Sequence, residues 1–141
     1  MKYYEPQNFK LQEFVPPDIY QEFGDKALFL LDQNMVKMVD GIRNFFGVPV
    51  TINNWHIKGS FTLRGFRPSD TSVGVKYSQH KYGRAADMDI QGYTAEDARQ
   101  AILKNQKSPL LNWITVIEDK VNWLHADCRN IKTEQIILVQ P

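Results

Sequence analysis

The chain lacks most of the features that mark a specialised class of protein. It has one cysteine, Cys128, so an intrachain disulfide framework and a zinc site built from several thiolates are both excluded. Its 17 basic residues nearly balance its 16 acidic residues, and with a net charge of +1 no nucleic-acid-binding face is expected. No apolar run approaches the roughly 20 residues of a membrane span, so membrane insertion is not expected.

The N-terminal residues, MKYYEP, also lack the apolar stretch of a signal peptide. We therefore expect synthesis in the cytoplasm without a signal peptide. Hydrophobic residues make up 43% of the chain and charged residues 23%, which suits one packed core. Because no repeat, low-complexity tract or linker interrupts the chain, the sequence predicts a single domain over residues 1–141 and a monomer.

The apolar pattern predicts helices in the first third of the chain and again after residue 94. Residues 1–24 read as an N-terminal arm followed by a short helix over 18–23. Over 25–46, apolar residues recur at three- and four-residue steps, which predicts one long helix starting at Asp25 and ending at Gly47. A further helix is predicted over 94–105, with a threonine cap.

Short strands are predicted around these helices, at 50–53, 85–90, 113–118, 123–129 and 135–139. Together they indicate an α+β domain, in which a small antiparallel sheet packs against one long helix and one or two shorter ones. Residues 54–79 are polar and glycine-punctuated, with little periodicity. So long an irregular stretch in a compact domain usually carries a functional site.

Three histidines are present, and two of them stand near acidic residues in a pattern that suits a metal site. A catalytic zinc site usually has three protein ligands and one water, and His80, Asp87 and His125 would supply two imidazoles and a carboxylate. Gly83 allows a tight turn between the first two. Strand alternation places Asp127 on the same face as His125, where it would orient a ring nitrogen or a nearby basic group. Spacing alone leaves open the alternative that these are hydrogen-bonded core histidines.

Two segments raise the weight of the metal interpretation. Residues 78–87, SQHKYGRAAD, resemble the S-x-H-x-x-G-x-A-x-D signature of zinc D-alanyl-D-alanine carboxypeptidase-like peptidases. Residues 123–127, WLHAD, resemble the second signature of that group, W-x-H-x-D. The group includes phage endolysins and shares a core with hedgehog signalling domains. The resemblance covers residues 48–130, and residues 52–56 and 64–67 are similar to the segment that precedes the first signature in small phage-type members.

The resemblance implies a hedgehog/D,D-peptidase-like fold and a zinc ion held by His80, Asp87 and His125. Zinc lowers the pKa of a bound water from 15.7 to about 7 and polarises a carbonyl. The implied reaction is hydrolysis of a peptide bond, of D,D- or L,D-type, in the stem peptide of bacterial peptidoglycan.

The general base is where the chain departs from part of the family. Many members carry a carboxylate three residues before the last histidine, but this chain has Asn122 there, and an amide cannot act as a base. Other members place a glutamate six or seven residues before, which corresponds to Glu118. We therefore expect Glu118 as the base, with Asp119 as the alternative. The competing interpretation is that Glu118 only ends a strand in solvent.

Other residues are assigned to substrate. Arg67 resembles the family arginine that stabilises the tetrahedral intermediate or anchors a substrate carboxylate, with Arg64 as its competitor. Ser78 either hydrogen-bonds in the site or caps a turn, and Trp123 is expected to line the groove. His56 is expected to have no metal role.

These expectations point to a zinc peptidase related to phage or prophage lysis, which would reach the wall after release during lysis or by virion delivery. A catalytically weak zinc-binding structural or wall-binding module of a virion is the alternative, and Asn122 keeps it open. A thiol enzyme built on Cys128 and His125 is a third, less favoured interpretation.

Overall fold

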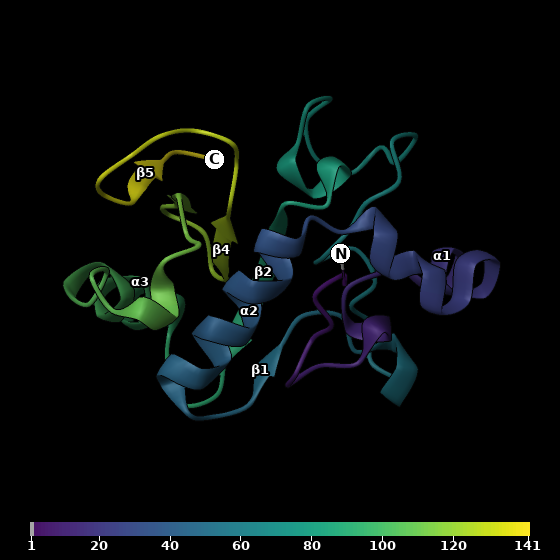
Figure 1. Ribbon diagram of the computed structural model, residues 1–141, viewed down its shortest axis with the longest axis horizontal. Coiled ribbons are helices and arrows are strands. Elements are labelled where there is room, and N and C mark those ends of the chain that lie inside the picture. The colour runs from purple at the N-terminus through teal and green to yellow at the C-terminus, as the bar shows by residue number, and fades with distance from the viewer. Residues whose placement is uncertain (1) are drawn as a thin grey trace.

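The computed structural model describes residues 2–141, which form one five-stranded sheet with three α-helices (Figure 1). The sheet order is β1-β2-β4-β3-β5. Its strands are β1 (Val50–Thr51), β2 (Ala85–Ile90), β3 (Val116–Glu118), β4 (Leu124–Asp127) and β5 (Ile137–Val139). The helices are α1 (Pro17–Phe23), α2 (Gln33–Phe46) and α3 (Ala95–Lys104). This confirms the expected mixed fold with one long helix and two shorter ones.

The predicted helix over 25–46 is wrong in its first part. Gly24–Leu30 forms a 3-10 helix, and Leu31 is extended (φ −99°, ψ 136°), so that α2 starts only at Gln33. Asp32, rather than Asp25, caps α2, because its side chain accepts a hydrogen bond from the Asn34 amide at 2.9 Å. The apolar spacing misled because side chains three residues apart lie on one side of a 3-10 helix as well as of an α-helix.

The expectation of an antiparallel sheet is also wrong at one edge. β1, β2, β4 and β3 pair antiparallel, whereas β5 pairs parallel to β3, which makes the sheet mixed. The chain leaves β4 and runs through nine residues before β5, which is long enough to return to the starting end of β3. Sequence patterns report that a strand exists but carry little information on its direction.

The two faces of the sheet differ sharply. The core cluster lies between one face and helices α2 and α3, with Met38, Ile42 and Ile102 from the helices. The sheet residues in that cluster include Ala86, Met88, Ile117, Leu124 and Ala126. The alternating residues of the same strands point to the other face, which the irregular segment before β2 partly covers.

Several local predictions are confirmed. Thr94 caps α3 by accepting a hydrogen bond from the Asp97 amide at 3.0 Å, and Gly47 ends α2 in the left-handed conformation (φ 67°). Within residues 2–141, none of the helices has the length and apolar character needed to cross a membrane.

Candidate metal centre

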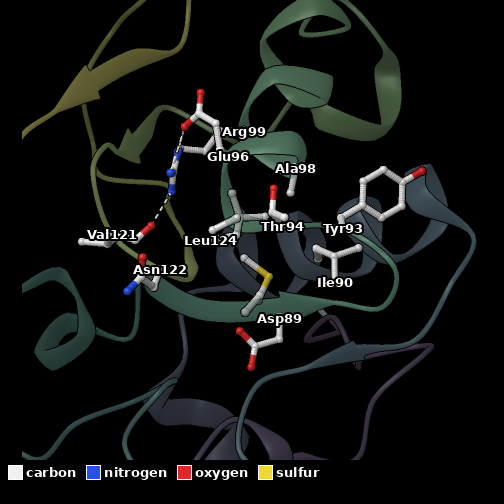
Figure 2. A pocket seen from close by; sticks show the side chains of 12 residues that line it. Asp89, Ile90, Tyr93, Thr94, Glu96, Ala98, Arg99, Val121, Asn122 and Leu124 are labelled. Carbon is white, nitrogen blue, oxygen red and sulfur yellow. Dashed lines mark hydrogen bonds and ion pairs between the residues drawn. The ribbon is translucent and has the colours of Figure 1, made fainter.

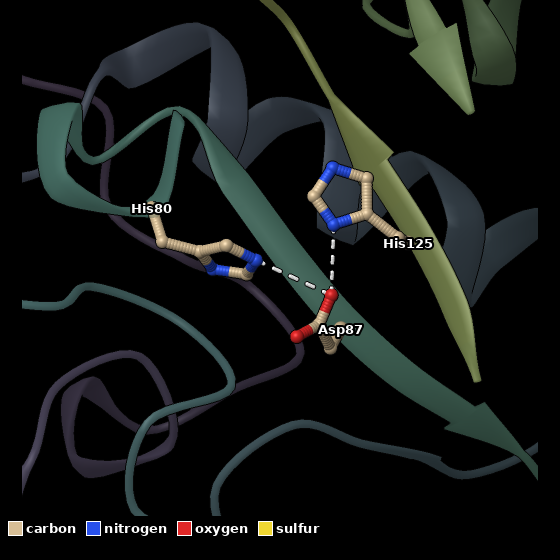
Figure 3. A group of neighbouring side chains, drawn as sticks. All are labelled: His80, Asp87 and His125. Atoms are coloured by element: carbon tan, nitrogen blue, oxygen red, sulfur yellow. Dashed lines mark hydrogen bonds and ion pairs between the residues drawn. The ribbon is translucent and has the colours of Figure 1, made fainter. Parts of the chain in front are cut away.

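Three side chains converge on the face of the sheet opposite the core (Figure 3). His80 comes from the 3-10 helix Gln79–Tyr82, Asp87 from β2 and His125 from β4. Asp87 Oδ1 lies 2.8 Å from His125 Nδ1 and 3.3 Å from His80 Nε2. One ligand atom from each residue lies within 4.8 Å of the others, and all three residues are buried. The group predicted from the sequence could therefore hold a metal ion.

Each imidazole is oriented by a partner on its other nitrogen. His80 Nδ1 lies 2.8 Å from the Gly65 carbonyl oxygen, which can only accept, so Nδ1 carries the proton and Nε2 is left for a metal. His125 Nε2 lies 3.1 Å from Asp127 Oδ2, which leaves Nδ1 facing Asp87. Such outer partners set the tautomer and the ring orientation of metal-binding histidines. The expected role of Asp127 as orienter agrees with this geometry.

The donor set fits a divalent metal in kind, and two of its three separations are close to those of a tetrahedral site. Imidazole nitrogen and carboxylate oxygen suit zinc, and also iron, nickel and copper. Metal–ligand distances of about 2.0–2.1 Å in a tetrahedral site place ligand atoms about 3.3 Å apart. The His80–Asp87 separation of 3.3 Å already matches, and the 2.8 Å between His125 and Asp87 needs a shift of only about half an ångström.

Local backbone features explain how the motif places its ligands. The Ser78 side chain accepts a hydrogen bond from the His80 amide at 3.3 Å, so it caps the turn that carries this ligand. Gly83 ends that turn with φ 66°, and a Cβ there would lie 2.3 Å from the Leu30 carbonyl oxygen. Glycine is therefore needed for both its conformation and its lack of a side chain. The antiparallel register then sets Asp87 directly opposite His125.

Charges in the site stabilise one another. Burial alone would raise the pKa of Asp87, but its hydrogen bonds with His125 and His80 hold that pKa well below its usual value. Burial would likewise lower the pKa of His125, yet its bonds with Asp127 and Asp87 raise it to about 9. The metal-free site thus pairs an anionic carboxylate with a protonated imidazole at neutral pH.

Glu118 lies in this site, and Asp119 does not. Glu118 is directly opposite His125 across β3 and β4, and its Oε2 is 3.5 Å from His125 Nδ1. Asp119 Oδ1 instead lies 3.7 Å from Nε of Arg99, a buried residue of α3. The geometry favours Glu118 over Asp119 as a base.

Arg99 also anchors the turn between β3 and β4. Its Nη1 donates to the Val121 carbonyl oxygen at 2.9 Å, and its Nη2 lies 2.9 Å from Glu96 Oε2 (Figure 2). Nη1 also donates to the Trp123 carbonyl oxygen at 3.3 Å. Asn122 lines a pocket beside α3 and does not line the pocket over the three candidate ligands. It does line an adjoining pocket, whose walls also include Asp87 and Arg67.

The two arginines assigned to substrate occupy different surroundings. Arg67 Nη2 donates to Asp87 Oδ2 at 3.1 Å, and its Nε donates to the Leu63 carbonyl oxygen at 2.7 Å. Burial lowers the pKa of Arg67, against the opposing effect of Asp87 and Glu118. Arg64 forms a bidentate ion pair with Asp89 at 2.8 and 2.9 Å and lines a neighbouring pocket. Of the two, Arg67 is the one in contact with a candidate ligand.

An open pocket of about 560 Å³ lies over the three candidate ligands. Ser78 and Trp123 line it, along with Arg67 and Glu118. Residues of the segment 73–79 and residues 139–141 also contribute to its walls. A buried ligand group at the base of an open pocket leaves room for water and a substrate.

Sequence reasoning missed two contributors to this pocket, Arg129 and the end of the chain from Val139. Arg129 donates from Nε and Nη2 to the two oxygens of Asp127, at 2.8 and 2.6 Å, and this bond raises the pKa of Arg129. Its position two residues after Asp127, beyond the strand, was a usable signal. No local signal marked Val139, because its place depends on the parallel pairing of β5.

The remaining candidates lie outside the site. Cys128 is buried, its thiol donates to the Arg84 carbonyl oxygen at 3.5 Å, and burial raises its pKa to about 12. A thiolate nucleophile is therefore disfavoured. His56 lies in the 3-10 helix Trp55–Ile57 and is outside the candidate ligand group.

Comparison of the chain with protein-family models, with curated proteins and with solved structures gives no match. The interpretation of the site therefore depends on its own geometry and on the motif resemblance.

Proposed function

We propose that the protein is a zinc-dependent peptidase that hydrolyses a peptide bond of bacterial peptidoglycan. The observation that carries the proposal is the buried group of His80, Asp87 and His125 beneath an open pocket, with the carboxylate of Glu118 3.5 Å from one of them. Two histidines and one carboxylate form a recurring ligand set of hydrolytic zinc enzymes, which keep a fourth position for water. The resemblance of residues 78–87 and 123–127 to the peptidase signatures supports the choice of substrate.

In this proposal the metal, when bound, activates a water molecule and polarises the scissile carbonyl. Glu118 accepts the proton of the attacking water and passes it to the leaving amine. Its position beside His125, within the same pocket, supports this role. Asp127 and the Gly65 carbonyl hold the two imidazoles in the tautomers that the metal requires.

Arg67 serves two purposes in the same scheme. Its bond to Asp87 Oδ2 orients that carboxylate, so that Oδ1 faces the histidines. Its positive charge lies at the wall of the pocket, where it would stabilise the negative charge that develops on a carbonyl oxygen in the transition state. Ser78 and Trp123 line the pocket that would take the stem peptide, while Arg64 braces the adjoining wall through Asp89.

Digestion of purified peptidoglycan tests the proposal directly. The protein is incubated with peptidoglycan, with and without a chelator, and the released fragments are identified by mass spectrometry. We expect the chelator to abolish the release of fragments and added Zn²⁺ to restore it. The masses of the fragments identify the bond that is cleaved. Zinc binding without cleavage would contradict the peptidase and favour the wall-binding module.

A matched pair of variants tests the base. Glu118→Gln keeps the shape of the side chain but cannot accept the proton, so turnover should fall at least about 100-fold while zinc is retained. Asp119→Asn changes the neighbouring carboxylate, which faces Arg99 rather than the pocket, and should keep most activity. Equal losses in the two variants would remove Glu118 from the mechanism.

A cell-wall substrate also implies that the protein reaches the wall after release, during phage or prophage lysis or with a virion. Expression in a bacterial host, with and without a membrane-permeabilising protein, tests this. Lysis is expected only when both are present.

A further inference from the structure

The candidate site continues across the sheet to its last strand. Direct partners on neighbouring strands point to the same face, with Cβ atoms about 4.5–5.5 Å apart. Asp87 is opposite His125, His125 is opposite Glu118, and Glu118 is opposite Val139. A single row of side chains therefore crosses β2, β4, β3 and β5. It starts with the two candidate ligands, continues with Glu118 and ends with the apolar side chain of Val139.

The last strand also holds the backbone around Glu118. The Ile137 amide donates to the Thr115 carbonyl oxygen at 3.0 Å, and the Asp119 amide donates to the Val139 carbonyl oxygen at 2.8 Å. These two bonds lie at the two ends of β3, and the second is next to Glu118, the final residue of that strand. The candidate ligands come from β2, β4 and a 3-10 helix, whereas β5 pairs with β3, the strand that carries Glu118. In the strand pairing, β5 therefore supports the candidate base and contacts no candidate ligand.

We propose that Val139 is a positioning residue for Glu118, and that β5 has the function of holding the carboxylate of Glu118 toward the metal site. Val139 lines the pocket together with Glu118, whereas its neighbour Leu138 pairs with the core residue Ile117 and has 46% of its surface exposed. Because Val139 pairs with Glu118 on the strand opposite β4, its side chain lies on the side of Glu118 that faces away from His125. This inference depends on the proposed function, in which Glu118 is the base.

The two neighbouring residues of β5 provide matched variants. Val139→Ala should lower kcat about 10-fold, because small displacements of a catalytic group are costly, with KM and zinc affinity changed by less than about twofold. Leu138→Ala removes a comparable side chain from the other face and should behave as the unmodified protein. Equal losses in the two variants, an effect of Val139→Ala on KM alone, or a parallel loss of zinc affinity would each overturn the inference.

A second pair tests the backbone without measuring activity. The Ile137 amide points toward β3, so the Leu138 amide points away from it. Ile137→Pro therefore removes a bond of the sheet, and Leu138→Pro does not. In the zinc-loaded protein, Ile137→Pro should speed hydrogen exchange of the Asp119 amide at least about 10-fold and abolish nuclear Overhauser effects between the Val139 methyl groups and the Glu118 side chain. Leu138→Pro should change neither.

The two proposals fail in different ways. If the unmodified protein never cleaves peptidoglycan, the proposed function fails, and the exchange rates and Overhauser effects still decide whether β5 positions Glu118. If cleavage occurs but these signals are absent in the unmodified protein, or survive in Ile137→Pro, the positioning inference is wrong and the peptidase proposal stands.

Discussion

The two faces of β2, β4 and β3 are made of alternating residues of the same strands, yet one face is apolar and the other is charged. Toward the helices lies an apolar row with essentially no exposed surface: Ala86, Ala126 and Ile117. Away from the helices lies a charged row: Asp87, His125 and Glu118. Burial of apolar surface stabilises the fold by about 25 cal/mol per Å². Burial of charged groups is unfavourable unless each is paired, and here each candidate ligand has such a partner.

The apolar face of the sheet stabilises the fold, and under the proposed function the charged face binds the metal. Successive residues of one strand can therefore be changed with separate consequences. β4 offers the best case, since Leu124 faces the core and His125 faces the candidate metal.

Changing His125 should have the largest effect on binding. His125→Asn removes an imidazole ligand but keeps a polar group between Asp87 and Asp127. We expect metal affinity to fall by more than the roughly 10–100-fold that loss of an outer partner causes, with the fold retained. Titration calorimetry with Zn²⁺ and circular dichroism measure the two properties. Unchanged affinity would show that the metal is held elsewhere.

Changing Leu124 should affect stability instead. Leu124 is 1% exposed, so Leu124→Ala leaves a cavity and should lower the free energy of unfolding by about 2–5 kcal/mol. The folded fraction should still bind metal with nearly the original affinity. Denaturant unfolding, followed by metal titration at low denaturant, checks both statements. A large loss of affinity with little loss of stability would contradict the division between the faces.

Changing Asp127, the hydrogen-bond partner of His125 Nε2, should have an intermediate effect on metal affinity. Asp127→Asn weakens the bond that orients the imidazole and leaves Arg129 without its ion pair, so metal affinity should fall about 10–100-fold. Asp89→Asn is the matched control, because the Asp89 side chain is half exposed and its ion pair with Arg64 lies beside the site. Surface pairs of this kind contribute about 0–1 kcal/mol, so affinity should hardly change. Equal effects would remove the special role of Asp127.

The smallest expected effect is the number of protons released when the metal binds. In the metal-free protein the pKa of His125 is raised to about 9, so this ring is protonated at pH 7 and must lose a proton to bind a metal. Binding should release about one proton at pH 7 and fewer as the pH rises through 9. Calorimetry in two buffers with different ionisation enthalpies measures this release. No release at pH 7 would place the metal away from His125.

Much of the fold and of the ligand group could be predicted because their signals are local. The 85–90 strand, the Thr94 cap and the Gly47 stop depend on a few adjacent residues, and the structure confirms them. The start of α2 could not be predicted, because the spacing of apolar residues is compatible with a 3-10 turn as well as an α-helix. The choice between Glu118 and Asp119 was also open, since adjacent strand residues face opposite sides and only pairing with β4 shows which is inside.

The sequence by itself determined that His80, Asp87 and His125 are of the right kinds and lie in segments that suit ligands, because glycine conformation and strand alternation are short-range properties. Only the tertiary structure decided that these three side chains lie close together and that Asp119 pairs with Arg99 instead of facing the pocket. It also decided that β5 runs parallel to β3, which places Val139 beside Glu118. The physical reason is that these arrangements depend on strand register and direction, which contacts between distant segments determine.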